Sequence, residues 1–238
     1  MEVVGESIWL TEGEIVNFYG FPYPTRSVIV RLEDGNLWIW SPVRLTPALQ
    51  GEVDTLGRVS HLVSPNKIHH LYLPEWRAAY PDAKLWGPAS TIRKRSDLSF
   101  YGTLGESAPT AWRHEITQFW FYGSFALDEI VFFHHPSRTA ILADLSENFG
   151  DEFLCEHWSR WKRPIARFCK ITVGYGYAPL ELRLSWWNRK PAREAMAALL
   201  ELNPTQVIMA HGEWQRENGR AYLEQAFAWL LPQQPRFK

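Results

Sequence analysis

The chain has 238 residues, of which 46% are hydrophobic and 21% are charged, so it can bury a sizeable core and should not be disordered. Its net charge of −1 gives no basic excess of the kind that nucleic-acid binding usually requires. Cys155 and Cys169 are too few for a disulfide framework and form no CxxC pair. Because we find neither a signal peptide nor a membrane span, we expect a cytoplasmic protein. Its expected partners are small molecules, not nucleic acid or a membrane, and a homodimer stays open.

The first half of the chain is predicted to be mainly β-structure. Asp34-Gly35 is typical of a hairpin turn between two apolar runs, and Gly57 is a plausible helix end. The predicted elements, in chain order, are strands at 7–10, 27–32 and 36–40, a helix at 46–56, a strand at 59–63, a helix at 74–80, a strand at 84–86 and a helical turn at 88–94.

The second half begins with strands and ends with helices around one further strand. The predicted elements are strands at 115–121, 129–133 and 139–143, helical structure at 151–168, a helix at 191–202, a strand ending at Met209 and a helix at about 219–231. This order is not a regular βαβ alternation. It favours an α+β fold in which two mixed β-sheets pack on each other with helices on the outer faces, an αββα sandwich. Since no long linker interrupts the chain, we expect a single domain over 1–238 with a Trp-rich helical insertion at about 151–188.

Three of the predicted strands lead to residues that can bind a metal ion. The strand at 59–63 is followed by a loop that contains His69 and His70, the strand at 139–143 by Asp144, and the last strand by His211. Ligands in folds that contain parallel sheets lie at the ends of strands, so we expect these residues to converge. Imidazole and carboxylate groups suit one divalent ion such as Zn, Mn or Fe, which would lower the pKa of water for hydrolysis. The segments are too far apart in the sequence to form a local motif.

These segments resemble the metallo-β-lactamase-like hydrolase superfamily, whose fold is the αββα sandwich. Ile208–Gly212 resembles its final His-Gly motif, and Leu142-Ala143-Asp144 resembles the strand that ends in its metal-bridging Asp. The phrases 38–42, 64–70 and 132–139 resemble an uncharacterised branch of this superfamily, a domain family of unknown function. The resemblance covers most of the chain, from the first β meander to the last helix.

The sequence also departs from the superfamily's Thr-His-x-His-x-Asp-His motif. When Ser64 is placed on the Thr, Pro65 and Lys67 fall on the first two histidines, and neither can ligate a cation. Ser41 stands where many members carry Asp, and no His occurs near 122–124. The resemblance therefore implies that the first metal position has been lost.

The second metal position keeps residues that can ligate an ion. The resemblance implies His69, His70, Asp144 and His211 as its ligands. We interpret Asp144, Lys67 and His211 as the catalytic residues of a one-metal hydrolase of small esters, lactones or thioesters. In this hypothesis Lys67 pairs with Asp144 and replaces the charge of the missing ion.

Two alternatives remain open from the sequence. Without a metal, Asp144 would accept hydrogen bonds from Lys67 and His211, and the protein would be a pseudoenzyme or a small-ligand-binding protein. A nuclease is a weaker alternative, since it would need metals and usually a basic groove. In each case we expect the pocket wall to include Ser41, His134, His135 and Arg138, and its roof to include Trp158, Trp161, Trp186 and Trp187.

Overall fold

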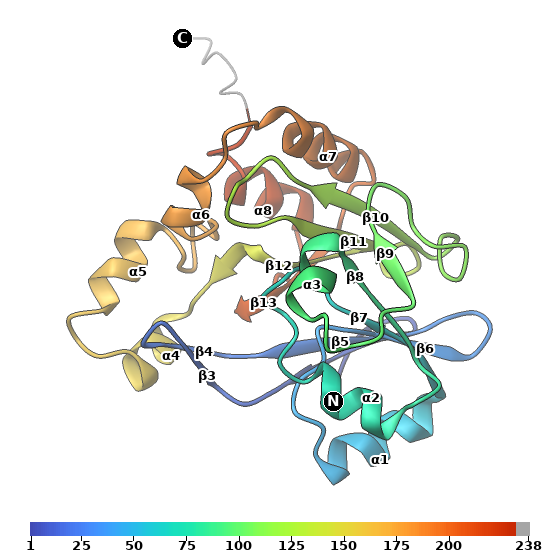
Figure 1. Cartoon of the computed structure of the whole chain (residues 1–238). Helices are drawn as coiled ribbons and strands as arrows, with labels where there is room; N and C mark the ends of the chain where they lie inside the picture. Colours follow the sequence, from blue (N-terminus) through green and yellow to red (C-terminus); the bar gives the residue numbers. More distant parts are fainter. Residues whose placement is uncertain (232–238) are drawn as a thin grey trace.

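The computed structural model describes residues 1–231, in which two β-sheets pack face to face between layers of helices (Figure 1). This is the αββα sandwich predicted from the sequence. The first sheet has seven strands in the spatial order β1 (Glu2–Gly5), β2 (Ile8–Glu12), β5 (Arg26–Arg31), β6 (Asn36–Trp40), β7 (Arg58–Val63), β8 (Lys84–Pro88) and β9 (Gly102–Leu104). Its first four strands pair antiparallel and its last four pair parallel.

The second sheet has the order β10 (Ile116–Phe121), β11 (Glu129–His134), β12 (Thr139–Asn148) and β13 (Gln206–Gly212). Strands β10 to β12 form an antiparallel meander, and β13 lies parallel to β12. A short hairpin, β3 (Val16–Phe18) and β4 (Phe21–Tyr23), stands apart from both sheets. The helices are α1 (Pro47–Leu56), α2 (Leu73–Ala79), α3 (Ala89–Lys94), α4 (Asp151–His157), α5 (Arg163–Cys169), α6 (Leu180–Leu184), α7 (Lys190–Glu201) and α8 (Gly219–Ala226).

Alternation along the strands explains how the layers are held together. In β6, Trp38 and Trp40 belong to the core between the two sheets, whereas Leu37 and Ile39 belong to a second core beneath α1 and α2. Successive side chains of a strand point to opposite faces, so a central strand that is covered on both faces is apolar throughout. Helices α7 and α8 cover the outer face of the second sheet in the same way (Figure 1).

A buried arginine joins the two sheets at one edge of the sandwich. Arg26 of β5 is 5% exposed and donates hydrogen bonds to the backbone carbonyls of Met209 (2.6 Å) and Gly212 (2.7 Å) in β13. Its guanidinium also contacts the Glu12 carboxylate, with two N–O distances of 2.8 and 2.6 Å. The cation is therefore paired although it is buried, which keeps the cost of its burial low.

The structure corrects several predicted boundaries. Strand β12 continues to Asn148, so Asp144 lies within the strand, where the pairing with β13 is irregular between Leu142 and Glu147. The helical stretch at 151–168 is two helices, and the last helix ends at Ala226. Strands β1, β3, β4 and β9 and helix α6 were not predicted, because each is only three to five residues long and too short to show a periodicity.

Helices α4 and α5 lie beside the β3–β4 hairpin, at one side of the sandwich (Figure 1). A small core joins them, in which Phe149, Leu154 and Trp158 pack with Phe21 and Tyr23 of the hairpin. The Trp158 indole also donates to the Pro22 carbonyl at 2.9 Å. The helical segment therefore holds the hairpin in place.

Candidate metal centre

His69, Asp144 and His211 come together at the end of the sandwich, and their ligand atoms lie within 4.8 Å of one another. The Nε2 atom of His69 is 3.3 Å from one Asp144 oxygen, and the Nε2 atom of His211 is 3.5 Å from the other. The three side chains are only 7–10% exposed. The structure thus unites three of the four residues proposed as ligands, from the loop after β7, from β12 and from β13.

The far nitrogen of each imidazole is held by a polar group. His211 Nδ1 lies 2.7 Å from the backbone carbonyl of Pro24, which can only accept, so this nitrogen carries a proton. His69 Nδ1 lies 2.7 Å from the Ser41 hydroxyl. Because the outer nitrogens are engaged, both Nε2 atoms turn toward Asp144, as in histidines that bind metals in proteins.

Gly212 explains why the motif is His-Gly. Its φ is +90°, and a Cβ at this position would lie 2.3 Å from the backbone carbonyl group of Asn148. A residue with a side chain would therefore push β13 away from β12 next to His211. Only glycine permits this close approach.

Two residues that the sequence analysis did not identify fix Asp144 in place. The Asn66 amide donates to Asp144 Oδ2 (2.7 Å) and to Glu129 Oε2 (3.0 Å). Glu129 in turn accepts the backbone N–H groups of Ala143 (2.7 Å) and Asp144 (2.8 Å). The side-chain oxygen of Asn66, Oδ1, accepts a hydrogen bond from the Ile68 N–H at 2.8 Å, which shapes the loop before His69.

Burial and neighbouring charges alter the pKa values of this cluster. Burial alone would raise the pKa of Asp144, but the two imidazoles outweigh it and hold the pKa well below its usual range. Burial alone would lower the pKa of His69, but the Asp144 carboxylate outweighs it and raises the pKa. Burial and the Asp144 charge raise the pKa of Glu129. One carboxylate that faces two imidazoles is therefore suited to hold a cation or a proton.

Two further predicted site residues lie beside this cluster without joining it. His70 turns toward Arg95, with 3.2 Å between His70 Nδ1 and the guanidinium, and burial together with Lys94 and Arg95 lowers its pKa to about 4. Lys67 lines the pocket, but the ion pairs of Asp144 within residues 1–231 are with the two histidines. The amide of Asn66 occupies the place on Asp144 that we expected for Lys67.

The pocket in front of the cluster has a volume of about 1010 Å³. Ser41 lines it, as expected, but His134, His135 and Arg138 do not, because they lie at the end of β11 and in the turn that joins it to β12. There His134 contacts Ser137, His135 contacts Thr117, and Arg138 donates to a backbone carbonyl.

The predicted tryptophan roof is also absent from the pocket lining in the described chain. Trp158 packs in the small core, whereas Trp161 and Trp187 are 68% and 86% exposed. The Trp-rich segment contributes other residues to the pocket, chiefly Pro179, Glu181, Leu182 and Ser185 in and around α6.

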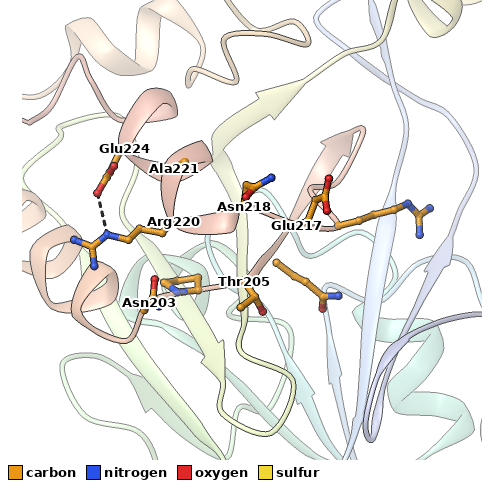
Figure 2. Close-up of a pocket in the computed structure, with 10 residues that line it drawn as sticks. Asn203, Thr205, Glu217, Asn218, Arg220, Ala221 and Glu224 are labelled. Atoms are coloured by element: carbon orange, nitrogen blue, oxygen red, sulfur yellow. Dashed lines mark hydrogen bonds and ion pairs between the residues drawn. The ribbon is translucent and has the colours of Figure 1, made fainter.

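A second, smaller pocket of about 490 Å³ lies at the opposite end of β13, beside α8 (Figure 2). Most of the residues that line it are of polar types, and Arg220 pairs with Glu224 at 3.0 Å within it (Figure 2). None of the proposed site residues borders this pocket. The chemistry-bearing residues therefore gather at the other end of the sheet.

The fold and the cluster together define a protein of the metallo-β-lactamase fold, and solved structures bear this out. A metallo-β-lactamase from Pontibacter korlensis is similar, with 11% identity, 95% of both chains covered and a TM-score of 0.62. The DIM-1 metallo-β-lactamase exposed to ceftazidime has 18% identity, covers 96% of this chain and 94% of its own, and has a TM-score of 0.65. FIM-1 from Pseudomonas aeruginosa, in its mono-zinc form, has 10% identity, 97% and 96% coverage and a TM-score of 0.59. Likeness at these identities shows the fold alone.

Residues 6–152, more than half of the chain, match the family described as "Domain of unknown function (DUF4336)", and the chain belongs to that family. The search of curated proteins found no match to this chain. The resemblance predicted from the sequence, to an uncharacterised branch with the metallo-β-lactamase fold, is therefore confirmed. Within residues 1–231, no helix combines the length and the apolar character that crossing a membrane requires.

Proposed function

We propose that the protein is a hydrolase of small ester, lactone or thioester substrates that uses one divalent ion held by His69, Asp144 and His211. The observation that carries this proposal is the orientation of the two imidazoles. Each directs Nε2 at an Asp144 oxygen from 3.3 to 3.5 Å, while its Nδ1 is engaged elsewhere.

This arrangement fits a cation. With the Nδ1 proton of His211 on the Pro24 carbonyl, a neutral ring presents the lone pair of Nε2 to the Asp144 carboxylate. His69 Nε2 is buried and has no hydrogen-bond partner among the described residues. When the His69 ring also carries its proton on Nδ1, toward the Ser41 hydroxyl, two lone pairs and an anion face one another and repel unless a positive charge lies between them. Two imidazole nitrogens and one carboxylate oxygen are a donor set that suits zinc, manganese or iron.

A divalent ion bound here would polarise a substrate carbonyl and lower the pKa of a water molecule. The chain's own residues would orient the reactants. Ser41 and Pro24 hold the two rings, and Asn66 and Glu129 hold the carboxylate. Lys67 lines the same pocket, and its ammonium group would stabilise negative charge that develops on the substrate oxygen.

A single ion is consistent with the residues at the lost first position. Pro65 and Lys67 cannot ligate a cation, and the Asn66 side chain is committed to Asp144, Glu129 and the loop backbone. The solved structure of FIM-1 is described in a mono-zinc form, so a protein of this fold can hold one zinc ion.

Metal analysis tests the proposal directly. We expect protein purified without chelator to carry about one zinc, manganese or iron ion per chain, and to be stabilised by about 2.7 kcal/mol at a metal concentration 100 times Kd. His211→Ala should abolish both effects, whereas His135→Ala, which removes an imidazole outside the pocket, should retain them. Wild-type protein that takes up no metal and gains no thermal stability would contradict the proposal. An esterase and lactonase panel on the loaded protein then tests the reaction.

A second candidate is a metal-free protein that binds a small ligand in the pocket. It is supported by the ion pairs of Asp144 with His69 and His211, which would satisfy the carboxylate if an imidazole were protonated. The raised pKa of His69, which the Asp144 carboxylate produces against the effect of burial, favours that protonation. In this case native mass spectrometry should show an organic ligand and no metal, and His211→Ala should change stability without changing metal content.

A further inference from the structure

Glu147 is a buried carboxyl group that the proposed mechanism does not use. It lies in β12, is 1% exposed and borders the pocket, and its Oε2 atom has no hydrogen-bond partner within the described chain. No ion pair involves its side chain among residues 1–231. A buried carboxyl oxygen without a hydrogen bond is costly, so this Oε2 atom is suited to receive a donor from a ligand in the pocket.

The surroundings of Glu147 favour a positively charged ligand. Glu181 of α6 borders the same pocket. Burial, together with the Asp144 and Glu181 charges, raises the pKa of Glu147, so a cation beside it would offset this crowding of negative charge. Tyr23 of the β3–β4 hairpin lies next to Glu147, and Phe18 and Tyr19 of the hairpin line the pocket further out. Carboxylates and aromatic faces together recognise organic cations. We call Glu147, Glu181 and Tyr23 the acidic wall.

The positive residues of the pocket belong to other elements. Lys67 and Lys94 come from the loop after β7 and from α3, and neither pairs with Glu147. A divalent ion is a poorer occupant of the acidic wall, because Glu147 is not part of the three-residue group whose ligand atoms converge. The unpartnered oxygen calls for an N–H donor, which an alkylammonium group supplies and a quaternary ammonium group does not.

We propose that the acidic wall is a subsite for the protonated alkylamine group of the substrate, which donates to the free oxygen of Glu147. This inference deepens the proposed function, on which its catalytic half rests, by naming amine-bearing esters as the substrate class. The ammonium group would bind at Glu147 while the ester group lies against His69, Asp144 and His211. Binding of the amine itself does not depend on catalysis.

The first experiment measures binding of n-hexylammonium and of 1-hexanol, its neutral isostere, to the full chain by calorimetry. We expect hexylammonium to bind roughly tenfold more tightly, as for a hydrogen bond between charged groups. Glu147→Gln should remove most of this preference, and Glu152→Gln, which deletes an exposed carboxylate on α4, should keep it. Equal affinity for the two ligands in the wild type, or an unchanged preference in Glu147→Gln, overturns the subsite.

If Glu147→Gln does not fold, Glu181→Gln takes its place, since it alters the same wall from an exposed position. A smaller loss of preference supports the subsite, and no loss overturns it. If Glu147→Gln instead lowers the zinc content of the protein, Glu147 is a metal ligand and the subsite is overturned.

The second experiment compares hydrolysis of ethyl 6-aminohexanoate with that of ethyl heptanoate. We expect a ratio of kcat/KM values of roughly ten in favour of the amine, falling toward one in Glu147→Gln. Hydrolysis of both esters at equal rates leaves the proposed function intact and overturns the subsite. Hexylammonium binding that depends on Glu147, with neither ester hydrolysed, supports the subsite and contradicts the proposed hydrolase.

Discussion

Two buried glutamates flank Asp144, and the structure treats them in opposite ways. Glu129 accepts three hydrogen bonds, from two backbone N–H groups and the Asn66 amide, so its carboxylate is fully engaged beneath Asp144. Glu147 lies three residues after Asp144 in the same sheet, borders the pocket and keeps one oxygen without a partner. Burial alone therefore does not determine what each glutamate does in the site. Glu129 positions the centre, whereas Glu147 is free to meet what enters the pocket.

Replacing the residue between the two glutamates should have the largest effect. Asp144→Asn removes the negative charge that faces both imidazoles, and we expect zinc affinity to fall by roughly 100-fold or more. Competition with a chromogenic chelator measures this. Asp151→Asn, on the exposed start of α4, should bind zinc as the wild type does. Unchanged zinc affinity in Asp144→Asn would contradict the assignment of Asp144 as a metal ligand, on which the comparison of the two glutamates depends.

Glu129→Gln should be strongly destabilising. The substituted amide keeps one acceptor oxygen and turns an NH₂ group toward N–H donors, so at least one buried donor loses its partner. We expect the free energy of unfolding to fall by about 2–3 kcal/mol. Urea denaturation measures it, and a loss below about 0.5 kcal/mol would mean that these hydrogen bonds are not what holds Glu129.

Acidification should act through histidines remote from both glutamates. Burial lowers the pKa of His61 and of His134 to about 4, from 6.5. The unfolded chain therefore binds more protons between pH 6.5 and 4, and stability that is complete above pH 6.5 is lost as the pH falls through this range. Between pH 6.5 and 5 we expect a loss of about 1–2 kcal/mol per histidine.

His61→Gln tests this assignment, because glutamine can still accept the hydrogen bond that the Trp86 indole donates to His61. The variant should show a shallower loss of stability between pH 6.5 and 5 in thermal melts. An identical slope in the wild type and the variant would place the acid sensitivity in other groups. The first candidates would then be His134 and His70, whose pKa values are also lowered to about 4.

Glu147→Gln should have the smallest effect on stability. It replaces a carboxyl group that has one unpartnered oxygen with an amide of the same shape, so the free energy of unfolding should change by less than about 1 kcal/mol. Measured in the same urea series as Glu129→Gln, it completes an isosteric pair. Equal losses in the free energy of unfolding of the two variants would contradict the distinction between Glu129 and Glu147.

The sequence predicts the sandwich and much of the centre because the apolar runs and strand ends are local patterns. Asp144 and His211 come directly after apolar runs in β12 and β13, and these runs are continuous because the strands are buried on both faces. The choice between His69 and His70 is not a local property. It depends on the loop, in which Asn66 accepts the Ile68 N–H and the Ser64 hydroxyl donates to the His69 carbonyl.

Glu129, Asn66 and Tyr23 could not be found by the same reasoning. Glu129 begins a strand and Asn66 lies in a loop, and both positions commonly carry solvated polar residues. Their roles arise only when β11, β12 and the loop after β7 meet. Tyr23 lies in a three-residue strand that shows no periodicity. Apart from Phe21, the residues of the core that holds it follow more than a hundred residues later in the chain.

The candidate metal centre lies where the two sheets meet. Pro24 and Ser41 adjoin strands of the first sheet, Asp144 and His211 belong to the second, and Arg26 joins the two beside them. A partly unfolded state in which the strands persist but the two sheets separate would lose this geometry. Metal affinity would then depend on the packing of the two sheets against each other and not on their secondary structure. Measuring it would therefore show whether the tertiary packing is intact.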